Sequence, residues 1–361
     1  MKVIVVGIAN QRTTVPIGSF PVTLHHDASY HHEIRHSVGG MGFSVARALS
    51  ALGNDVALAA PLGEDYPTAL IDTEAYRFDM STHLCTRSLA RTPRSVVLYD
   101  DAGARQIFND LTDSPGIAFH VDDLLPDVTQ ADITVLTSRR MAAGLATELA
   151  KRNLPFAVDL QNVDPMIRDD LAAYQEASED GLPPAGHCPP PTGEAELGIL
   201  AEAPVCFDEW VAPFLPARYI TMSSSRARGR EAEVLADVAH ASRAEVCVMT
   251  LAERGCLVLS RNPDGSWPAE PSHVPGEPVT ITNSLGAGEN FLAVLLHELI
   301  TCGADPITAA SRANIAVARL LADKPAHGGI TVDRLAELLG PGCAPRANPE
   351  SIPKRDPVST S

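Results

Sequence analysis

The sequence predicts an α/β fold with a mainly parallel central sheet and a small β appendage. From about residue 132 onward, short apolar strands alternate with helical patterns, which is the chain order of βαβ units and therefore of a parallel sheet. Residues 11–37 and 86–112 are β-prone but interrupt that order, so we place them in a separate small sheet.

Composition limits the classes of protein that fit. The chain has 361 residues, 45% of them hydrophobic and 20% charged, as expected of a globular protein with a large core. Its net charge is −17, from 45 acidic and 28 basic residues. This balance argues against nucleic acid or an anionic membrane as a general partner, and a phosphate-handling site would need local positive potential.

The cysteines and the N-terminus favour a cytoplasmic location. The seven cysteines are scattered and include no Cys-x-x-Cys pair, which argues against a disulfide framework and against a zinc knuckle. The apolar run in Met1–Gly7 is too short for a signal peptide and is typical of a buried first strand. No apolar run approaches the ~20 residues that a membrane span needs.

The first elements are a strand, a polar histidine-rich stretch and a helix. Val3–Ile8 is an apolar strand, and fragments such as Phe20–Leu24 in the stretch that follows are candidate short strands. A helix is predicted next, because apolar residues recur at i, i+3, i+4 and i+7 and a glycine follows as a stop signal. These residues are Val45, Ala48, Leu49, Leu52 and Gly53.

A strand, a turn and a hairpin follow. Asn54–Pro61 is an apolar strand, and Gly63–Asp65 turns the chain into another helix. Arg94–Asp100 and Arg105–Asn109 flank Asp101–Ala104, a pattern that predicts a β-hairpin with a glycine turn.

The second half contains the regular strand and helix order. Strands are predicted at Asp132–Thr137, Pro155–Leu160, Arg218–Met222, Val246–Leu251 and Cys256–Leu259, and helices at Ala142–Arg152 and Glu231–Ser242. Two segments fall outside the pattern. Residues 176–191 are rich in Pro, Gly and acidic residues and are expected to form a surface insertion, and residues 343–361 are expected to be a disordered tail.

The segment Val279–Glu289 contains the strongest local signal for chemistry. A β-prone stretch runs into Gly286-Ala287-Gly288, and an apolar helix starts at once. Backbone N–H groups converge at such a junction and suit an anion. A carboxylate there, Glu289, fits a base that takes a proton from a nucleophile attacking a phosphate. The alternative is a glycine-rich turn whose glutamate only complements the helix dipole.

These segments resemble the ribokinase-like (PfkB) family of sugar and nucleoside kinases over nearly the whole chain up to about residue 335. The family's Gly-Gly turn and small-residue helix ending in Leu-Gly is similar to Gly39–Gly53. Its Gly-x-Asp is similar to Gly63–Asp65, and its Asp-Thr-x-Gly-Ala-Gly-Asp to Asn283–Glu289. The order and spacing of these motifs make the resemblance more specific than any glycine run alone.

The resemblance implies one kinase domain over residues 1–335, with helices on both faces of the sheet and a β lid over the acceptor substrate. It also implies ATP and Mg²⁺ as cofactors, a sugar or nucleoside as the small-molecule partner, and a possible homodimer through the lid. Glu289 would be the base, with Gly286, Ala287 and Gly288 as the anion hole. Gly39, Gly40 and Ser44 would contact the acceptor, and the nucleotide would meet Ser223, Thr250, Ala252, Gly255, Asn283 and Ser284.

The chain departs from the family's pattern at five functional positions. Glu289 replaces the usual Asp, and Ser44 the usual Asn. The family's Asn-x-x-Glu, which helps to organise magnesium, would fall at Ser223–Arg226, where no acid is present. Ala252 replaces the first glycine of Thr-x-Gly-x-x-Gly, and an early acceptor-contacting Asp is missing from Gln11–Thr14. These changes keep open a second hypothesis, a catalytically inactive protein that retains the cleft for ligand binding or regulation.

Other residues admit two interpretations each. The histidines in 25–36 could hold a metal, but consecutive histidines of a strand point to opposite faces, so a solvated lid edge is favoured and no metal site is predicted. Asp159 would be either a magnesium-associated group at a strand end or a simple cap. Arg139 and Arg140 would meet phosphate or form a surface pair at a helix start.

Overall fold

The computed structural model describes most of the chain. The described residues are 1–22, 34–100, 104–111, 113–114, 117–119, 121–137, 139–162, 211–227, 229–280, 284–322 and 334–339. The predicted insertion at 176–191, the predicted tail at 343–361, Asn283 and the histidines at 25, 26, 31 and 32 lie outside these ranges.

The core of the molecule is an eight-stranded sheet in the order β12-β11-β10-β9-β8-β7-β1-β4. All neighbouring strands are parallel except at one edge, where β11 is antiparallel to both β10 and β12. The strands are β1 Lys2–Val6, β4 Asp55–Ala59, β7 Ile133–Leu136, β8 Phe156–Asn162, β9 Tyr219–Ser223, β10 Val246–Thr250, β11 Cys256–Ser260 and β12 Ser272–Val274. The predicted mainly parallel sheet is therefore confirmed.

Helices cover both faces of this sheet, and each face has its own buried apolar cluster. The helices are α1 Met41–Ala51, α2 Tyr66–Arg77, α3 Val121–Val128, α4 Arg139–Lys151, α6 Glu231–Ala241, α7 Ala287–Leu296, α8 Pro306–Ala322 and α9 Leu335–Leu339. On one face α1, α7 and α8 pack against the sheet, and on the other α3, α4 and α6 do so. Parallel strands buried on both faces explain why these strands are almost continuously apolar.

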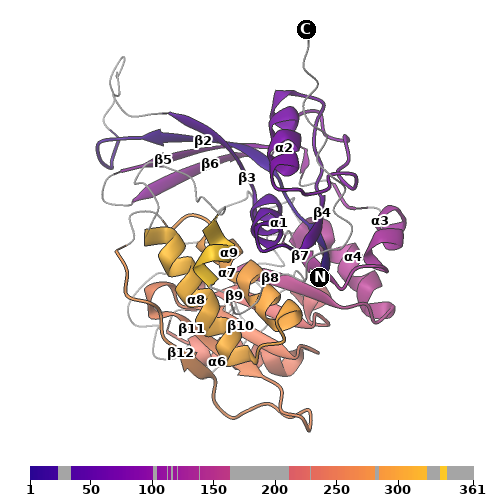
Figure 1. The fold of residues 1–361 in the computed structure, drawn as a ribbon, viewed down its shortest axis with the longest axis vertical. Helices are drawn as coiled ribbons and strands as arrows, with labels where there is room; N and C mark the ends of the chain where they lie inside the picture. Colours follow the sequence, from indigo (N-terminus) through magenta and orange to yellow (C-terminus); the bar gives the residue numbers. More distant parts are fainter. Residues whose placement is uncertain are drawn as a thin grey trace, which may run out of the picture.

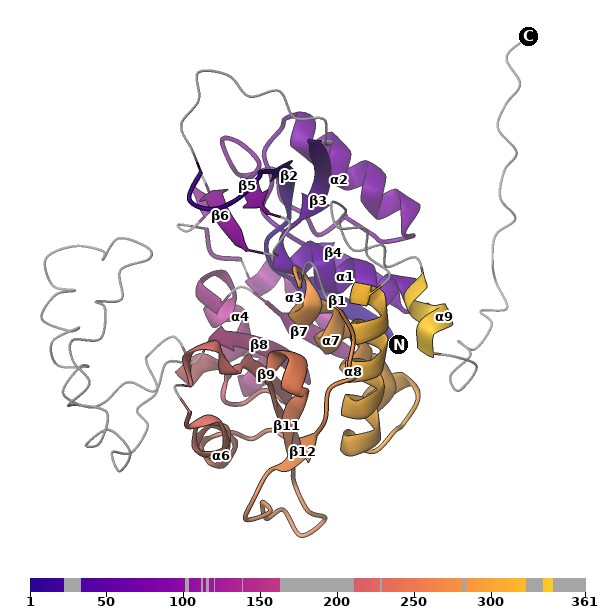
Figure 2. The same ribbon diagram turned by 90° about the vertical axis from the view of Figure 1, so that its left-hand side faces the viewer.

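A separate four-stranded sheet, in the order β3-β2-β5-β6, stands at one end of the molecule beside α2 (Figures 1 and 2). Its strands are β2 Asn10–Pro16, β3 Arg35–Gly39, β5 Arg94–Tyr99 and β6 Arg105–Asp110. Successive side chains of a strand point to opposite faces, and the buried ones on β5 are Ser95, Val97 and Tyr99. That face of the small sheet is therefore turned towards the body of the protein.

Most elements lie where the sequence predicts them, with the following exceptions. The prediction of a short strand at Phe20–Leu24 is wrong for its described part, because the chain bends there and the strand is β2, nearer the N-terminus. The sequence analysis did not predict the helices α3, α8 and α9, or the three-residue strand β12, whose Ser272 and His273 are exposed. β12 is too short to show an alternating pattern, whereas the apolar residues of α3 do recur with a helical period and were overlooked.

The start of α1 is held against the end of β1 by glycines. A Cβ on Gly42 would lie 2.8 Å from Cα of Gly7, and one on Gly7 would lie 2.0 Å from the Thr137 hydroxyl oxygen. Gly40 has φ 92°, and a Cβ there would lie 2.3 Å from the carbonyl oxygen of Ile8. These close approaches place the first turn of α1 at the carboxyl end of β1.

Two further observations concern the helices and the cysteines of the described residues. Within the described residues, no helix is both long and apolar enough to cross a membrane. Cys85, Cys247 and Cys256 are free thiols, and burial raises the pKa of Cys247 to about 12. Cys302 is disulfide-bonded, so the scattered cysteines are not all reduced.

Candidate functional site

The Gly286-Ala287-Gly288 turn opens α7 in the way that the sequence suggests. Gly286 adopts the left-handed conformation, with φ 85°, directly before the helix. The amide of Ala287 donates to the Ser284 carbonyl at 3.1 Å, whereas the next amides belong to the first turn and have no acceptor inside the helix. A Cβ on Gly288 would meet no atom within 4 Å, so the space beside the turn is open. This arrangement suits an anionic group.

Asn290, the residue after Glu289, stabilises the Gly286-Ala287-Gly288 turn through a side-chain hydrogen bond. Asn290 is 2% exposed, and its side-chain amide donates to the Gly286 carbonyl at 2.6 Å. Its Oδ1 is buried and has no hydrogen-bond partner among the described residues. The sequence analysis did not single out Asn290, because an asparagine in the first turn of a helix is ordinary.

Two arginines of the small sheet reach this turn. Nη1 of Arg105, on β6, donates to the Ser284 hydroxyl at 3.3 Å. Arg12, on β2, interacts electrostatically with both Glu289 and Arg105. Burial lowers the pKa of the Arg12 guanidinium from its ordinary value, Arg105 lowers it further, and Glu289 opposes both. The small sheet therefore contributes positive charge to the predicted catalytic turn.

The Arg12 side chain also lies against the Gly39-Gly40 turn. A Cβ on Gly39 would lie 2.5 Å from Nη2 of Arg12 and 2.7 Å from Oδ1 of Asn10. Asn10 is 6% exposed, and this oxygen is buried without a hydrogen-bond partner in the described part of the chain. Arg12 thus lies between the start of α1 and the start of α7, beside an unsatisfied acceptor that the sequence analysis missed.

The remaining predicted acceptor residues differ in how open they are. Gly40 caps α1, and its conformation and its contact with Ile8 give it a structural reason to be glycine. Ser44 is 5% exposed in the second turn of α1, so little of its hydroxyl is open to an acceptor. The contact between Ser44 and the acceptor therefore stays a prediction, because the Ser44 side chain is buried in this structure.

The predicted nucleotide residues Ser223 and Thr250 lie side by side. They are register partners at the carboxyl ends of the parallel strands β9 and β10. The Thr250 hydroxyl donates to the Met222 carbonyl at 3.3 Å, and the Ser223 and Ser225 hydroxyls are 2.6 Å apart. The carboxyl end of a parallel sheet is the usual place for a ligand in open α/β folds.

In the loop after β10, the backbone at Ala252 adopts a conformation that usually requires glycine. Ala252 has φ 54°, a left-handed conformation that alanine seldom adopts. Gly255 has φ 94°, and a Cβ there would lie 2.1 Å from the Val274 carbonyl oxygen. Ala252 therefore adopts a backbone conformation in which glycine has no steric penalty.

A cavity of about 560 Å³ adjoins this loop but lies away from the α7 turn. It is lined by the start of α6, by Leu251 and Leu257, and by His273. These elements pack on the α6 face of the sheet, whereas α7 belongs to the opposite face. The cavity is thus not the space in which the turn would meet a phosphate.

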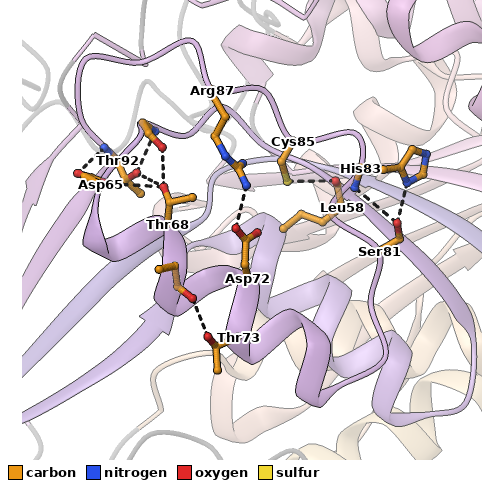
Figure 3. A network of polar contacts seen from close by, with 12 residues as sticks. Leu58, Asp65, Thr68, Asp72, Thr73, Ser81, His83, Cys85, Arg87 and Thr92 are labelled. Atoms are coloured by element: carbon orange, nitrogen blue, oxygen red, sulfur yellow. Dashed lines mark hydrogen bonds and ion pairs between the residues drawn. The ribbon is translucent and has the colours of Figure 1, made fainter. Parts of the chain in front are cut away.

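The Gly63–Asp65 motif lies directly before α2, and Asp65 contacts Thr92, two residues before β5 of the small sheet (Figure 3). Asp65 accepts from the Thr92 amide at 3.2 Å and pairs with Arg94 at 3.4 Å, and the Gly63 amide donates to the Thr92 hydroxyl at 2.9 Å. Burial raises the pKa of Asp65, but the hydrogen bonds from Thr92 and the charge of Arg94 outweigh it and hold the pKa below its ordinary value. The motif anchors the small sheet.

Asp159 has a local structural role. Its Oδ1 accepts from the Gln161 amide at 2.9 Å, in an irregular stretch of β8 where Gln161 has φ 56°. The Gln161 side chain in turn donates to the Thr137 carbonyl at 3.2 Å. These bonds support the capping interpretation of Asp159. α4 begins at Arg139, three residues before the predicted start, so Arg139 and Arg140 lie at a helix start, and their meeting phosphate stays a prediction.

The described residues do not include a cluster that could hold a metal ion by protein ligands alone. No group of three or more His, Cys, Asp or Glu in the described ranges could hold one. The stretch Ser223–Arg226, where the resemblance implies a magnesium-organising acid, offers hydroxyls and a guanidinium. His36 lies on β3, with Nδ1 3.0 Å from the Thr13 hydroxyl oxygen.

Comparison with known proteins agrees with the fold. The model of the pfkB family carbohydrate kinases matches residues 1–328. No curated protein matches the chain significantly.

Solved structures that resemble this one cover nearly the whole molecule. A microbiome-derived acarbose kinase is 21% identical with a TM-score of 0.70, over 94% of this chain and 98% of that one. The ribokinase of Thermotoga maritima is 16% identical (TM-score 0.64), and that of Arabidopsis thaliana, solved with ribose and ATP, is 17% identical (TM-score 0.63). Each of these two also covers 94% of this chain and 98% of its own.

Proposed function

This chain belongs to the pfkB family of carbohydrate kinases, and on that premise we propose that it transfers the γ-phosphate of ATP to a hydroxyl of a sugar or nucleoside. The kinase domain would span residues 1–335, with the small sheet as the lid over the acceptor. The observation that carries the proposal is the α7 turn, where Gly286–Gly288 and Glu289 face Arg12 and Arg105 of the small sheet.

The chemistry follows from these positions. The acceptor hydroxyl loses its proton to Glu289 and forms a bond to the γ-phosphorus, while the bond from that phosphorus to the β-phosphate oxygen breaks and ADP leaves. The amides of Gly286–Gly288 would stabilise the negative charge that develops on the transferred group. Because the described residues do not fit a protein-held magnesium ion, we assign no step to the protein's own metal ligands.

The nucleotide would extend from this turn towards the carboxyl ends of β9 and β10. Ser223, Thr250, Ala252 and Gly255 lie at those ends, and Ser284 lies at the turn. Asn283 is proposed to join this set, although it lies outside the described residues. ATP in the Arabidopsis ribokinase structure supports this choice of nucleotide, because the two chains share the fold.

The alternative is a catalytically inactive member of the family that binds a ligand. The absence of an acid from Ser223–Arg226 favours it, as does Glu289, whose extra methylene moves the carboxylate by about an ångström from where an aspartate would place it. The open, glycine-lined turn beside a carboxylate favours the enzyme.

Two substitutions at Glu289 distinguish the two functions. We expect Glu289→Gln to lower turnover about 10²-fold or more and to leave nucleotide binding intact, because it removes the proton acceptor and keeps the size. Glu289→Asp should reduce activity in an enzyme adapted to glutamate, and should restore some in a decayed one. The measurement is ADP release over a broad panel of sugars and nucleosides, with thermal shifts for nucleotide binding.

Glu270→Gln is the matched control, because Glu270 is an exposed acid in the loop before β12. It should change neither turnover nor binding. If neither wild type nor Glu289→Asp phosphorylates any acceptor of the panel, the kinase function is wrong, and the alternative of a catalytically inactive ligand-binding protein is supported.

A further inference from the structure

The face of the small sheet that is turned towards the body carries two arginines. Arg12 is the register partner of Ser95, which is buried on that face, and Arg105 is the partner of Tyr99, which is buried on it too. Side chains alternate along a strand, so Arg12 and Arg105 point the same way, towards α7. Their mutual electrostatic influence and the bond from Arg105 to Ser284 agree with this direction.

Arg12 is a half-buried cation without an ion-pair partner in the described part of the chain. The one acid that acts on it, Glu289, does so electrostatically and without a salt bridge. A buried cation is costly unless an anion compensates it, and a second cation, Arg105, adds to that cost. Within a chain of net charge −17, the two arginines form a local positive site.

The chemistry of this site does not match a neutral sugar. Hydroxyl groups would be bound by amide and carboxylate oxygens, and one such oxygen, Oδ1 of Asn10, is buried and unsatisfied beside Arg12. A guanidinium is instead matched by a carboxylate or phosphate, which it binds through two parallel hydrogen bonds. The site therefore offers Oδ1 of Asn10 and the Glu289 carboxylate for hydroxyl groups, and two guanidinium groups for an anion.

We propose that the acceptor is an anionic sugar, one that carries a phosphate or carboxylate, and that Arg12 and Arg105 bind this group while a hydroxyl faces Glu289. This inference rests on the proposed kinase function for the role of Glu289, but the binding of the anion does not require turnover. The position of Arg12 against Gly39 and Asn10, at the start of α1, assigns the anion to the acceptor rather than to the nucleotide.

The test is direct binding, measured by calorimetry and thermal shift without nucleotide. The probes are matched pairs: ribose and ribose 5-phosphate, fructose and fructose 6-phosphate, glucose and gluconate. We expect at least one anionic member to bind more tightly than its neutral partner. Arg12→Gln should weaken that binding by about 10- to 100-fold, because it removes charge-assisted hydrogen bonds. Arg12→Lys should recover part of the lost affinity, since lysine keeps the positive charge but cannot make two parallel hydrogen bonds to the anion.

Arg94→Gln is the matched control on the same sheet. Arg94 is the register partner of Gln11, so it points to the opposite face, where it pairs with Asp65. Its substitution should leave the binding of the anionic sugar unchanged. Equal binding of neutral and anionic partners, or no binding of any anionic sugar, would overturn the proposal.

The arginines could instead bind a phosphate of the nucleotide. A second experiment, which measures ATP binding to Arg12→Gln, distinguishes the two possibilities. If Arg12→Gln weakens ATP binding and leaves the anionic sugar unaffected, the arginines serve the γ-phosphate and the proposal is wrong. If the anionic sugar binds through Arg12 but no phosphate is transferred to it, the anionic sugar is not the acceptor and the proposal is wrong, whereas the kinase function is tested separately by the acceptor panel.

Discussion

The side-chain amide nitrogen of Asn54 lies 3.2 Å from Nδ1 of His297, and both residues are buried where the loop before β4 meets the end of α7. The Thr301 hydroxyl and the N-terminal ammonium of Met1 both donate to Oδ1 of the same asparagine, at 3.1 and 3.4 Å. His297 begins a π-helical turn, His297–Thr301, so this network stabilises an irregular stretch of helix.

This network predicts a pH dependence of stability. Burial lowers the pKa of His297 from its ordinary value of 6.5, Glu298 opposes this, and the N-terminal charge adds to it. The unfolded chain therefore takes up the proton first as the pH falls, so the folded protein should lose stability below pH 6.5, by at most about 1.4 kcal/mol per pH unit from this group. Urea denaturation between pH 5 and 8 measures the slope. His297→Gln should flatten it, whereas exposed His273→Gln should not.

The strained loop after β10 predicts a stabilising substitution. Ala252 has φ 54°, where glycine has no steric penalty, so Ala252→Gly should raise the free energy of unfolding by about 0.5–1 kcal/mol. The same change at Ala236, inside α6, should lower it by about 1 kcal/mol. Two curves shifted in the same direction would show that the left-handed conformation carries no strain.

Two glycines of the proposed site should respond in opposite ways. Gly288→Ala meets no atom within 4 Å and lies in a helix, so stability should stay the same or rise by up to about 1 kcal/mol while nucleotide affinity falls about 10-fold or more. Gly40→Ala should cost about 3 kcal/mol, because its Cβ would lie 2.3 Å from the Ile8 carbonyl oxygen. Unchanged nucleotide affinity in Gly288→Ala would place the phosphates elsewhere.

The anchor of the small sheet is also testable. Asp65→Asn removes the charge that pairs with Arg94 and should lower the free energy of unfolding by about 1 kcal/mol. Glu64→Gln changes the exposed acid one residue earlier and should stay within about 0.5 kcal/mol of wild type. Chemical denaturation at pH 7 compares the two, and equal curves would remove Asp65 as an anchor.

Much of the fold could be predicted from the sequence, because buried parallel strands and amphipathic helices leave clear patterns. Strands such as β7 and β10 are short apolar runs, and the Gly286-Ala287-Gly288 sequence predicts the start of the helix that follows. The prediction failed for β12, which has only three residues and two of them exposed, so no alternation can be recognised. It also overlooked α3, although the apolar residues of that short helix recur with a helical period.

The site was less predictable, because it depends on which distant side chains meet. The sequence analysis noted only that Gln11–Thr14 lacks an acid, and did not foresee that Arg12 would face Glu289. Strand register decides that Arg12 and Arg105 share a face, and register is a property of the assembled sheet. Likewise, nothing in the residue type of Ala252 reveals its left-handed backbone.

The contact between Arg12 and Gly39 couples the two positions. A Cβ at position 39 would lie 2.5 Å from Nη2 of Arg12, so a larger residue there would have to displace the flexible guanidinium from the Gly39-Gly40 turn. We therefore expect substitutions at the two positions to be non-additive, with the effect of a change at position 39 depending on whether position 12 is an arginine.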